Sequence, residues 1–278
     1  MEGQVRIWIG CSVGMRSAVL SAKVLYLFIL LITRQVSSIN PNCDNLEKQY
    51  KLKCGTGQAT IKNCCNLVAM GSGEDDSEPL GPSGVYSITG GSPFTSNKVY
   101  CDMDTDNGGW TVIQRNTNNS MNWISFSRSW VDYENGFGDL RADFWYGLKA
   151  IHAMTQTGQW EMRTDFRYAN NKTWTYFHYD HFSVGCASEE YPLSVGGYKG
   201  IVFKGLYDGH DEAKFSTYDN DNDKAHFTCA ITSKCGWWYY ACDAINPNER
   251  PPEVSLRPRR EKPVMVDMIN IKIRPKQC

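Results

Sequence analysis

The sequence has almost no net charge and few long apolar runs. Its 278 residues carry 29 basic and 30 acidic side chains, which gives a formal net charge of −1. Nucleic-acid-binding domains concentrate Lys and Arg, so we exclude a nucleic-acid partner. No apolar run reaches the length of about 20 residues that a membrane-spanning helix needs. Collagen-like Gly-x-y tracts and heptad repeats are also absent, so we expect no stalk of either kind.

Known catalytic motifs are missing as well. The sequence contains no G-x-S-x-G, H-E-x-x-H or G-x-x-x-x-G-K-[ST] pattern. His178 and His181 lie in an aromatic stretch without a recognisable set of catalytic partners. We therefore expect structural histidines and no enzyme. Aromatic residues, in contrast, are plentiful (9 Trp, 15 Tyr and 11 Phe), which excludes a globally disordered chain.

The first 38 residues have the layout of a secretory signal. Val24 to Ile32 is an unbroken apolar run of nine residues, preceded by Arg16 and Lys23 and followed by the small residues at 36–38. We expect a signal peptide over 1–38 and a secreted protein with no membrane span in its mature form. A signal-anchor is the alternative, because the charged region before the apolar run is unusually long.

Cysteine is the most informative residue type. The chain has 11 cysteines, and removal of residues 1–38 takes away Cys11 and leaves ten. An even number in an exported chain predicts disulfides, and the absence of C-x-x-C argues against zinc. Two glycosylation sequons, at Asn118 and Asn171, agree with export.

Short strands and turns dominate the rest of the chain, which predicts an α+β domain with a mostly antiparallel sheet. Leu140, Phe144, Leu148 and Ile151 share one helical face, with Asp139 as the N-cap, so we expect one helix there. After Gly209 the chain is irregular, which is typical of a functional region. The expected strands cover 98–103, 110–114, 160–166, 173–182, 198–206 and 264–273.

A charged, proline-rich stretch precedes the last expected strand. Residues 249–263 predict an exposed, extended loop that contains Arg257-Pro258-Arg259-Arg260. This tetrapeptide has the form that processing proteases cut in the secretory pathway. An uncut basic loop is the alternative.

The sharpest local pattern is Asp219-Asn220-Asp221-Asn222-Asp223. Three carboxylates on one turn repel one another unless a cation lies between them, and oxygen ligands favour calcium. The EF-hand form is excluded, since its sixth position is Lys224 and its twelfth is Ala230. A solvated acidic loop closed by Asx-turns is the alternative.

A second pattern is the aromatic run between two cysteines, Gly236-Trp237-Trp238-Tyr239-Tyr240-Ala241. Four consecutive aromatic side chains in a loop form either a flat surface that stacks against a ligand or a part of the core.

Several motifs resemble those of the fibrinogen C-terminal (fibrinogen-related) domain. They are SGVYSI, VYCDMDTDNGGWTVIQRN, FSTYDNDND, GWW and MINIKIRP, and their order matches from about Cys64 to Pro275. The family includes ficolins, tachylectin-like lectins, the fibrinogen β and γ chains, angiopoietins and tenascins. The resemblance implies a fibrinogen C-terminal-like domain over 64–278, with few short helices and a calcium-containing C-terminal subdomain. Residues 39–63 are then a short cysteine-containing leader.

The resemblance also implies a calcium ligand set. The side chains of Asp221 and Asp223 and the main-chain oxygens of Ala225 and Phe227 are the expected ligands. They match the family positions in spacing.

Disulfide pairings follow from the resemblance too. It implies Cys64–Cys101 and Cys229–Cys242, with Cys65 as the other candidate partner of Cys101. The pairing of Cys43, Cys54, Cys65, Cys186, Cys235 and Cys278 stays open. Cys186 with Cys235 is one hypothesis, because both positions depart from the family pattern, and a bridge between two copies of the chain is another.

Ligand residues carry over less well. Tyr239 matches an aromatic position of the family's glycan pocket, and Trp238 and His226 are further candidates. Pro251 stands where the family has a later Tyr, and Asp243 stands where fibrinogen γ has its pocket His. Two hypotheses therefore remain: a lectin-like protein of innate immunity that binds acetylated or acidic glycans, and an extracellular protein-binding module. Assembly of copies, with or without disulfides, is compatible with both.

Overall fold

The computed structural model describes residues 62–67, 81–89, 95–117, 124–200, 208–242, 246–250, 254–256 and 264–278. The chain divides into two compact units, Met1–Gly55 and Thr56–Cys278, and every described residue belongs to the second. The expected signal peptide, nearly all of the leader, Asn118 and the Arg257–Arg260 stretch lie outside the described residues. No helix in the described ranges combines the length and apolarity needed to cross a membrane.

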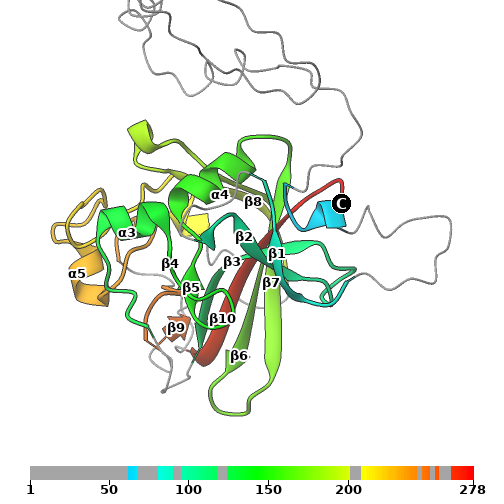
Figure 1. The fold of residues 1–278 in the computed structure, drawn as a ribbon. Helices are drawn as coiled ribbons and strands as arrows, with labels where there is room; N and C mark the ends of the chain where they lie inside the picture. Colours follow the sequence, from blue (N-terminus) through cyan, green and yellow to red (C-terminus); the bar gives the residue numbers. More distant parts are fainter. Residues whose placement is uncertain are drawn as a thin grey trace, which may run out of the picture. The chain divides into compact units, whose positions relative to one another are not determined.

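A ten-stranded antiparallel sheet forms the centre of the domain. Its main path runs β1-β2-β3-β10-β6-β7-β8, with β4 and β5 extending from β3 and β9 pairing with β10. The last strand of the chain, β10, lies in the middle of the sheet between β3 and β6 and is drawn red in Figure 1. The strands are β1 (Gly84–Ser87), β2 (Lys98–Asp102), β3 (Trp110–Thr117), β4 (Phe137–Gly138), β5 (Phe144–Trp145), β6 (Trp160–Tyr168), β7 (Trp174–Val184), β8 (Leu193–Lys199), β9 (Val254–Leu256) and β10 (Val264–Pro275).

Helices are short and lie around the sheet. The α-helices that lie wholly within the described residues are α3 (Trp130–Asn135), α4 (Leu148–Thr155) and α5 (Cys229–Ser233), and the 3₁₀ turns are η3 (Ala187–Glu189) and η4 (Asp208–His210). In α3, Ser129 and Asp132 form a reciprocal capping box, which satisfies backbone donors that the first turn leaves free. This α+β architecture, with a mostly antiparallel sheet and few short helices, is the predicted fold class.

The expected helix over 140–151 is only half correct. Phe144 and Trp145 form strand β5, which pairs with β3, and the helix α4 starts at Leu148. Between them Gly147 adopts φ of 103°, where a Cβ would lie 2.7 Å from the carbonyl oxygen of Asn135. A left-handed glycine in such close contact ends one element before the next begins. All four apolar residues are buried, but Leu140 lies in a turn, Phe144 on β5, and Leu148 and Ile151 on α4.

Strand alternation predicts the centre of the sheet better than its edge. The expected strands at 98–103, 110–114, 160–166, 173–182 and 264–273 overlap β2, β3, β6, β7 and β10. The strand expected at 198–206 overlaps β8 (Leu193–Lys199) at its first two residues, and residues 201–206 lie outside the described residues. Its period-2 burial begins at Leu193, ahead of the aromatic residues that suggested a strand.

Alternation also separates a core face from a polar face. On β6, Trp160, Met162 and Phe166 are buried in the core, while the charged residues between them point to the other face. On that polar face Lys272 of β10 is only 4% exposed, and its Nζ lies 2.5 Å from carboxylate oxygens of both Asp102 and Asp165. One buried ammonium thus joins β2, β10 and β6.

The disulfides connect distant parts of the domain. Cys64 pairs with Cys101 and Cys229 with Cys242, the two pairs that the resemblance implies. Cys65 pairs with Cys278, across 213 residues of sequence. Cys186 is disulfide-bonded as well.

The hypothesis of a bond between Cys186 and Cys235 is wrong. Cys235 is free and buried. Its Sγ accepts a hydrogen bond of 2.8 Å from the Asn246 side chain, and burial raises the pKa of the thiol far above its ordinary value. A buried, protonated thiol is inert toward oxidation.

Loss of the buried ammonium should destabilise the sheet in a pH-dependent way. Burial by itself would raise the pKa of Asp102, but Lys272 outweighs that effect and holds the pKa below its ordinary value of 3.8. The stabilisation is present above the unfolded-state pKa of about 3.9 and is lost as the pH falls through the lower folded-state pKa. We expect Lys272→Met to lower the free energy of unfolding by about 3–5 kcal/mol at neutral pH. The loss should shrink at about pH 3, where the abandoned carboxylates accept protons.

Urea unfolding at both pH values measures this difference. The matched control is Lys149→Met, which removes an exposed lysine from its ion pair with Glu134 and should cost at most about 1 kcal/mol. Equal losses for Lys272→Met at neutral and acid pH would contradict the proposed role of the carboxylates.

Candidate functional site

The acidic loop leaves the core at Phe215 and returns to it at Cys229. Ser216 forms an antiparallel bridge with Trp237, and the side chain of Asn222 donates to the carbonyl of Phe215. The Ser216 hydroxyl accepts from the backbone N–H of Asn222 at 2.9 Å. These bonds fix both ends of the Asp219–Asp223 turn against the aromatic segment.

Four buried aromatic rings hold this part of the chain in place. Phe215 lies 5.0 Å from Tyr133 of α3, 5.8 Å from Trp145 of β5 and 5.1 Å from Trp238, measured between ring centroids. The Tyr133 hydroxyl also accepts the backbone N–H of Gly236 at 3.0 Å. A helix, a strand and two loops that are far apart in the sequence thus share one aromatic cluster.

Of the three aspartates, Asp219 has a structural role. Its Oδ1 accepts the backbone N–H of Trp130 at 2.9 Å and the hydroxyl of Thr217 at 2.7 Å. It therefore ties the loop to the start of α3.

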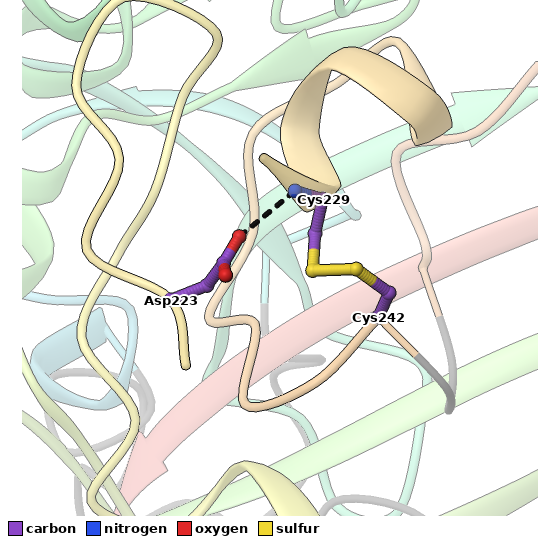
Figure 2. Close-up of side chains that lie close together, drawn as sticks. All are labelled: Asp223, Cys229 and Cys242. Carbon is purple, nitrogen blue, oxygen red and sulfur yellow. Dashed lines mark hydrogen bonds between the residues drawn. A yellow bond between two sulfur atoms is a disulfide. The ribbon is translucent and has the colours of Figure 1, made fainter. Parts of the chain in front are cut away.

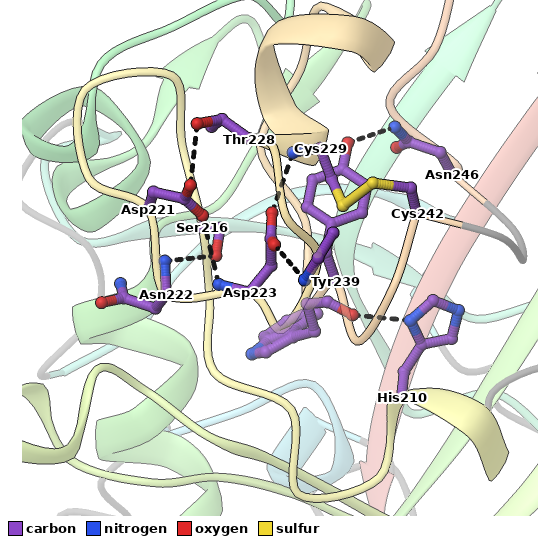
Figure 3. Close-up of a disulfide and its surroundings, with 12 residues drawn as sticks. His210, Ser216, Asp221, Asn222, Asp223, Thr228, Cys229, Tyr239, Cys242 and Asn246 are labelled. Carbon is purple, nitrogen blue, oxygen red and sulfur yellow. Dashed lines mark hydrogen bonds between the residues drawn. A yellow bond between two sulfur atoms is a disulfide. The ribbon is translucent and has the colours of Figure 1, made fainter.

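Asp221 and Asp223 close the second half of the loop (Figures 2 and 3). Asp223 accepts backbone N–H groups from Ala225 and Cys229, each at 2.8 Å. Asp221 accepts the Thr228 hydroxyl at 2.7 Å and the backbone N–H of Asp223 at 3.2 Å. The Cys229–Cys242 disulfide lies beside Asp223 and joins the end of the loop covalently to the end of the aromatic segment, so the two cannot separate.

The charge of this pair is uncompensated within the described residues. None of Asp219, Asp221 and Asp223 forms an ion pair there. Burial, together with the negative charge of Asp221, raises the pKa of Asp223 above its ordinary value. A divalent cation would remove this repulsion.

The donor set at the loop suits a hard cation. Each carboxylate oxygen of Asp221 and Asp223 accepts one hydrogen bond and retains a second lone pair. The carbonyl oxygens of Ala225 and Phe227 accept no hydrogen bond from any described residue. Oxygen ligands of this kind, in a loop without fixed octahedral geometry, match calcium.

Two other groups of potential ligands do not form metal sites. Asp223 lies near the sulfur atoms of Cys229 and Cys242, but sulfurs in a disulfide are not thiolates and do not bind metal as thiolates do. His178 lies 2.9 Å from Glu161 on the sheet's polar face. There Arg274 and Lys199 already pair with the carboxylates of Glu161 and Asp180, which leaves a closed ion-pair network.

The aromatic run divides into a buried part and one exposed residue. Trp237, Trp238 and Tyr239 are at most 3% exposed, whereas Tyr240 is 52% exposed. The Trp238 ring N–H donates to the carbonyl of Tyr191 at 2.7 Å, and the Tyr239 hydroxyl donates to that of Cys235 at 2.9 Å. This corrects the expectation for Trp238 and Tyr239, which are core residues with satisfied polar atoms. Of the three expected ligand residues only His226 is exposed.

The sequence analysis did not identify the buried residues that hold the aromatic run and the residues after it against the domain. His210 is 3% exposed, its Nδ1 lies 2.6 Å from the carbonyl of Trp238, and burial lowers its pKa to about 4. Gln114 and Asn116 of β3 both donate to the carbonyl of Pro247. Residues 246–248, which follow the aromatic run, are therefore packed into the domain. No sequence signal joins these residues, since their contacts span 28 residues for His210 and more than 100 for Gln114 and Asn116.

Exposed apolar side chains surround the acidic loop. Tyr218 precedes Asp219, and Val131 follows Trp130, whose N–H binds Asp219. Tyr240 accepts the backbone N–H of Lys224 through its carbonyl. We call the following set the rim: Val131, Tyr218, Phe227, Ile231 and Tyr240, each 49–60% exposed.

Comparison with known proteins identifies the family of this architecture. The family described as fibrinogen beta and gamma chains, C-terminal globular domain, matches residues 61–253. Fibrinogen-like protein A of Apostichopus parvimensis is 39% identical over 194 residues, which cover 67% of this chain and 64% of that protein. Tenascin-R of Gallus gallus is 42% identical over 167 residues, which cover 60% of this chain and 12% of that protein. The chain thus spans less than two thirds of the length of either relative.

Solved structures agree. The fibrinogen-like globe domain of human ANGPTL6 aligns with a TM-score of 0.65 and 27% identity, over 80% of this chain and 98% of that chain. Lamprey fibrin D-dimer, complexed with the peptide Gly-His-Arg-Pro-amide, aligns with a TM-score of 0.61 and 25% identity, over 91% of this chain and 85% of that chain.

Proposed function

Because the chain belongs to the family of fibrinogen C-terminal globular domains, whose members are non-enzymatic binding modules, we propose that it is a secreted, calcium-binding recognition protein. The organisation proposed is a signal peptide over 1–38, a leader over 39–63 and the recognition domain over 64–278. Asn118 and Asn171 are the proposed glycosylation sites, and export agrees with the disulfides of the domain.

Calcium is the proposed cofactor of the acidic loop. Asp221 and Asp223 would bind it through their side chains, and Ala225 and Phe227 through their carbonyl oxygens. When bound, the ion supplies positive charge between carboxylates that have no counter-ion among the described residues. It would hold the rim residues of this loop in a fixed arrangement and so act as a structural clamp.

Thermal unfolding with and without calcium tests the site. At a Kd of about 10⁻⁴–10⁻³ M, about 10 mM calcium stabilises by about 1.4–2.7 kcal/mol, which raises Tm by about 3–10 °C. Asp221→Asn should abolish this rise, because it keeps an acceptor for Thr228 and removes one charged ligand. Asp106→Asn, an exposed acid of the β2–β3 turn, is the control and should retain the rise. An unchanged wild-type Tm after addition of chelator would refute the assignment.

A protein is the ligand that the exposed rim favours. Its five side chains present apolar surface around one acidic loop, while two of the three residues expected in a glycan pocket are buried. Exposed apolar side chains that gather in one patch are typical of protein-binding surfaces. Lectin-like binding of acetylated or acidic glycans is the second candidate, favoured by the exposed rings of Tyr218 and Tyr240 beside the proposed ion.

Two binding measurements separate these candidates. We expect the multivalent protein to bind no acetylated, sialylated or sulfated glycan on an array, with or without calcium. On cells that bind the protein, Phe227→Ser together with Ile231→Ser should weaken binding about 10-fold or more. The control is Trp174→Ser, which removes an equally exposed side chain from β7. Calcium-dependent glycan binding that Tyr240→Ser abolishes would establish the lectin function instead.

A count of the cysteines supports a proposal for how copies of the chain assemble. Three disulfides use six cysteines, and Cys235 is free and buried. Cys186 is disulfide-bonded too. Once Cys11 is removed with the signal peptide, only Cys43 and Cys54 remain to pair with it. One leader cysteine is then left over, and we propose that it joins two copies of the chain.

Non-reducing electrophoresis of the secreted protein should show a dimer that reductant converts to monomer. One of the substitutions Cys43→Ser and Cys54→Ser should yield only monomer, because the remaining leader cysteine then pairs with Cys186. Cys235→Ala should leave the dimer intact, since its buried thiol has no part in the bridge. A monomeric wild-type protein without a free exposed thiol would contradict the proposal that one leader cysteine is left without a partner in its own chain.

A further inference from the structure

The β6–β7 hairpin presents one glycosylation sequon at its tip. β6 ends at Tyr168, β7 begins at Trp174, and every residue from Asn170 to Thr173 is exposed. Lys172, the middle residue of the sequon, adopts φ of 60°, which places the turn in a left-handed conformation. The tip has no cover among the described residues, so a transferase can reach Asn171.

Hydrogen bonds fix the direction of the Asn171 side chain. Its Oδ1 accepts the Thr173 hydroxyl at 2.8 Å and the Thr173 backbone N–H at 3.1 Å. The carbonyl end of the amide is thereby held against Thr173, and Nδ2, the atom that carries an N-linked sugar, points away from these bonds. A sugar on Asn171 would start from the face of the hairpin on which the Thr173 side chain lies.

Tyr168 lies on that same face. The backbone N–H of Tyr168 donates to the carbonyl of Thr173 at 3.0 Å, one step beyond the last register pair, Arg167 with Trp174. Side chains directly opposite each other on paired strands share a face, and the next pair points the other way. Trp174 is therefore on the opposite face, where its ring lies 5.9 Å from the Arg167 guanidinium.

The Tyr168 ring has one side in the core and one side open. It is half-buried and meets Phe166 edge-to-face at 5.6 Å, which leaves part of its surface in solvent. Aromatic faces bind the apolar C–H face of a pyranose ring, because both surfaces gain by leaving water. Tyr168 and Thr173 face each other across the hairpin, and Asn171 lies in the short turn between them, near the open side of the ring.

We propose that the first N-acetylglucosamine on Asn171 packs against the ring of Tyr168 and stabilises the β6–β7 hairpin. The glycan would thus stabilise the end of β6, the strand that pairs with β10. The inference depends on the proposed secretion, since only the secretory pathway attaches this glycan.

The test uses the secreted full chain with Asn118→Gln, so that Asn171 carries the only glycan, trimmed enzymatically to a single N-acetylglucosamine. The acetyl methyl protons of that sugar should show an upfield ring-current shift by NMR. Tyr168→Leu should abolish the shift and Trp174→Leu, on the opposite face, should leave it. The sugar should raise Tm by about 2–4 °C relative to the Asn171→Asp protein, and this gain should disappear in Tyr168→Leu.

Three results would overturn the inference: an unmodified Asn171 in the secreted protein by glycopeptide mass spectrometry, an unchanged shift in Tyr168→Leu, or loss of the shift in Trp174→Leu. The first of these, found together with secretion and with calcium-dependent stability, leaves the proposed function standing. Retention of the chain inside the cell as a bare polypeptide refutes both.

Discussion

The position of β10 is the constraint on which the rest of the structure depends. The last strand of the chain fills the centre of the sheet, hydrogen-bonded to β3 on one side and β6 on the other. Without it, the sheet separates into a part formed by β1 to β5 and a part formed by β6 to β8. Lys272 reinforces this position through carboxylates on both sides. The sheet also positions the acidic loop, because the aromatic cluster packs Trp145 of β5 against Phe215, which precedes the loop.

Elements that alternation and local motifs encode could be predicted from the sequence. Predictions failed where contacts between residues far apart in the chain determine the local structure. The period-2 patterns of β6 and β10 identify these strands, because successive side chains of a strand point to opposite faces of the sheet. Leu140 to Ile151 misleads, since Phe144 satisfies a helical spacing while its backbone pairs with Arg115 on β3. Tyr239 is a similar case. Its position in a loop suggested a ligand contact, but Asn246, which follows Cys242 in the sequence, covers its hydroxyl group.

The acidic loop combines stability and exposure in one short segment. Its carboxylates accept backbone donors and leave lone pairs over, so the same groups that shape the loop can hold an ion. The buried Trp237 and Trp238 form its base, while Phe227 and Ile231 stay at the surface. In the proposed recognition function, a few exposed side chains held by a rigid, mostly aromatic support would make the contacts, and small changes in the loop would alter the ligand without altering the fold.

The adjacent cysteines Cys64 and Cys65 determine how mechanical tension enters the domain. Cys64 is bonded to β2 and Cys65 to the residue that ends the chain just after β10. A pull on the polypeptide before Cys64 is therefore shared between two strands, which lie on either side of β3. Neither strand can be peeled from the sheet alone while both disulfides are intact. A domain tethered through its leader would thus carry the load of its bound ligand on the sheet as a whole, and reduction of either bond would concentrate that load on a single strand.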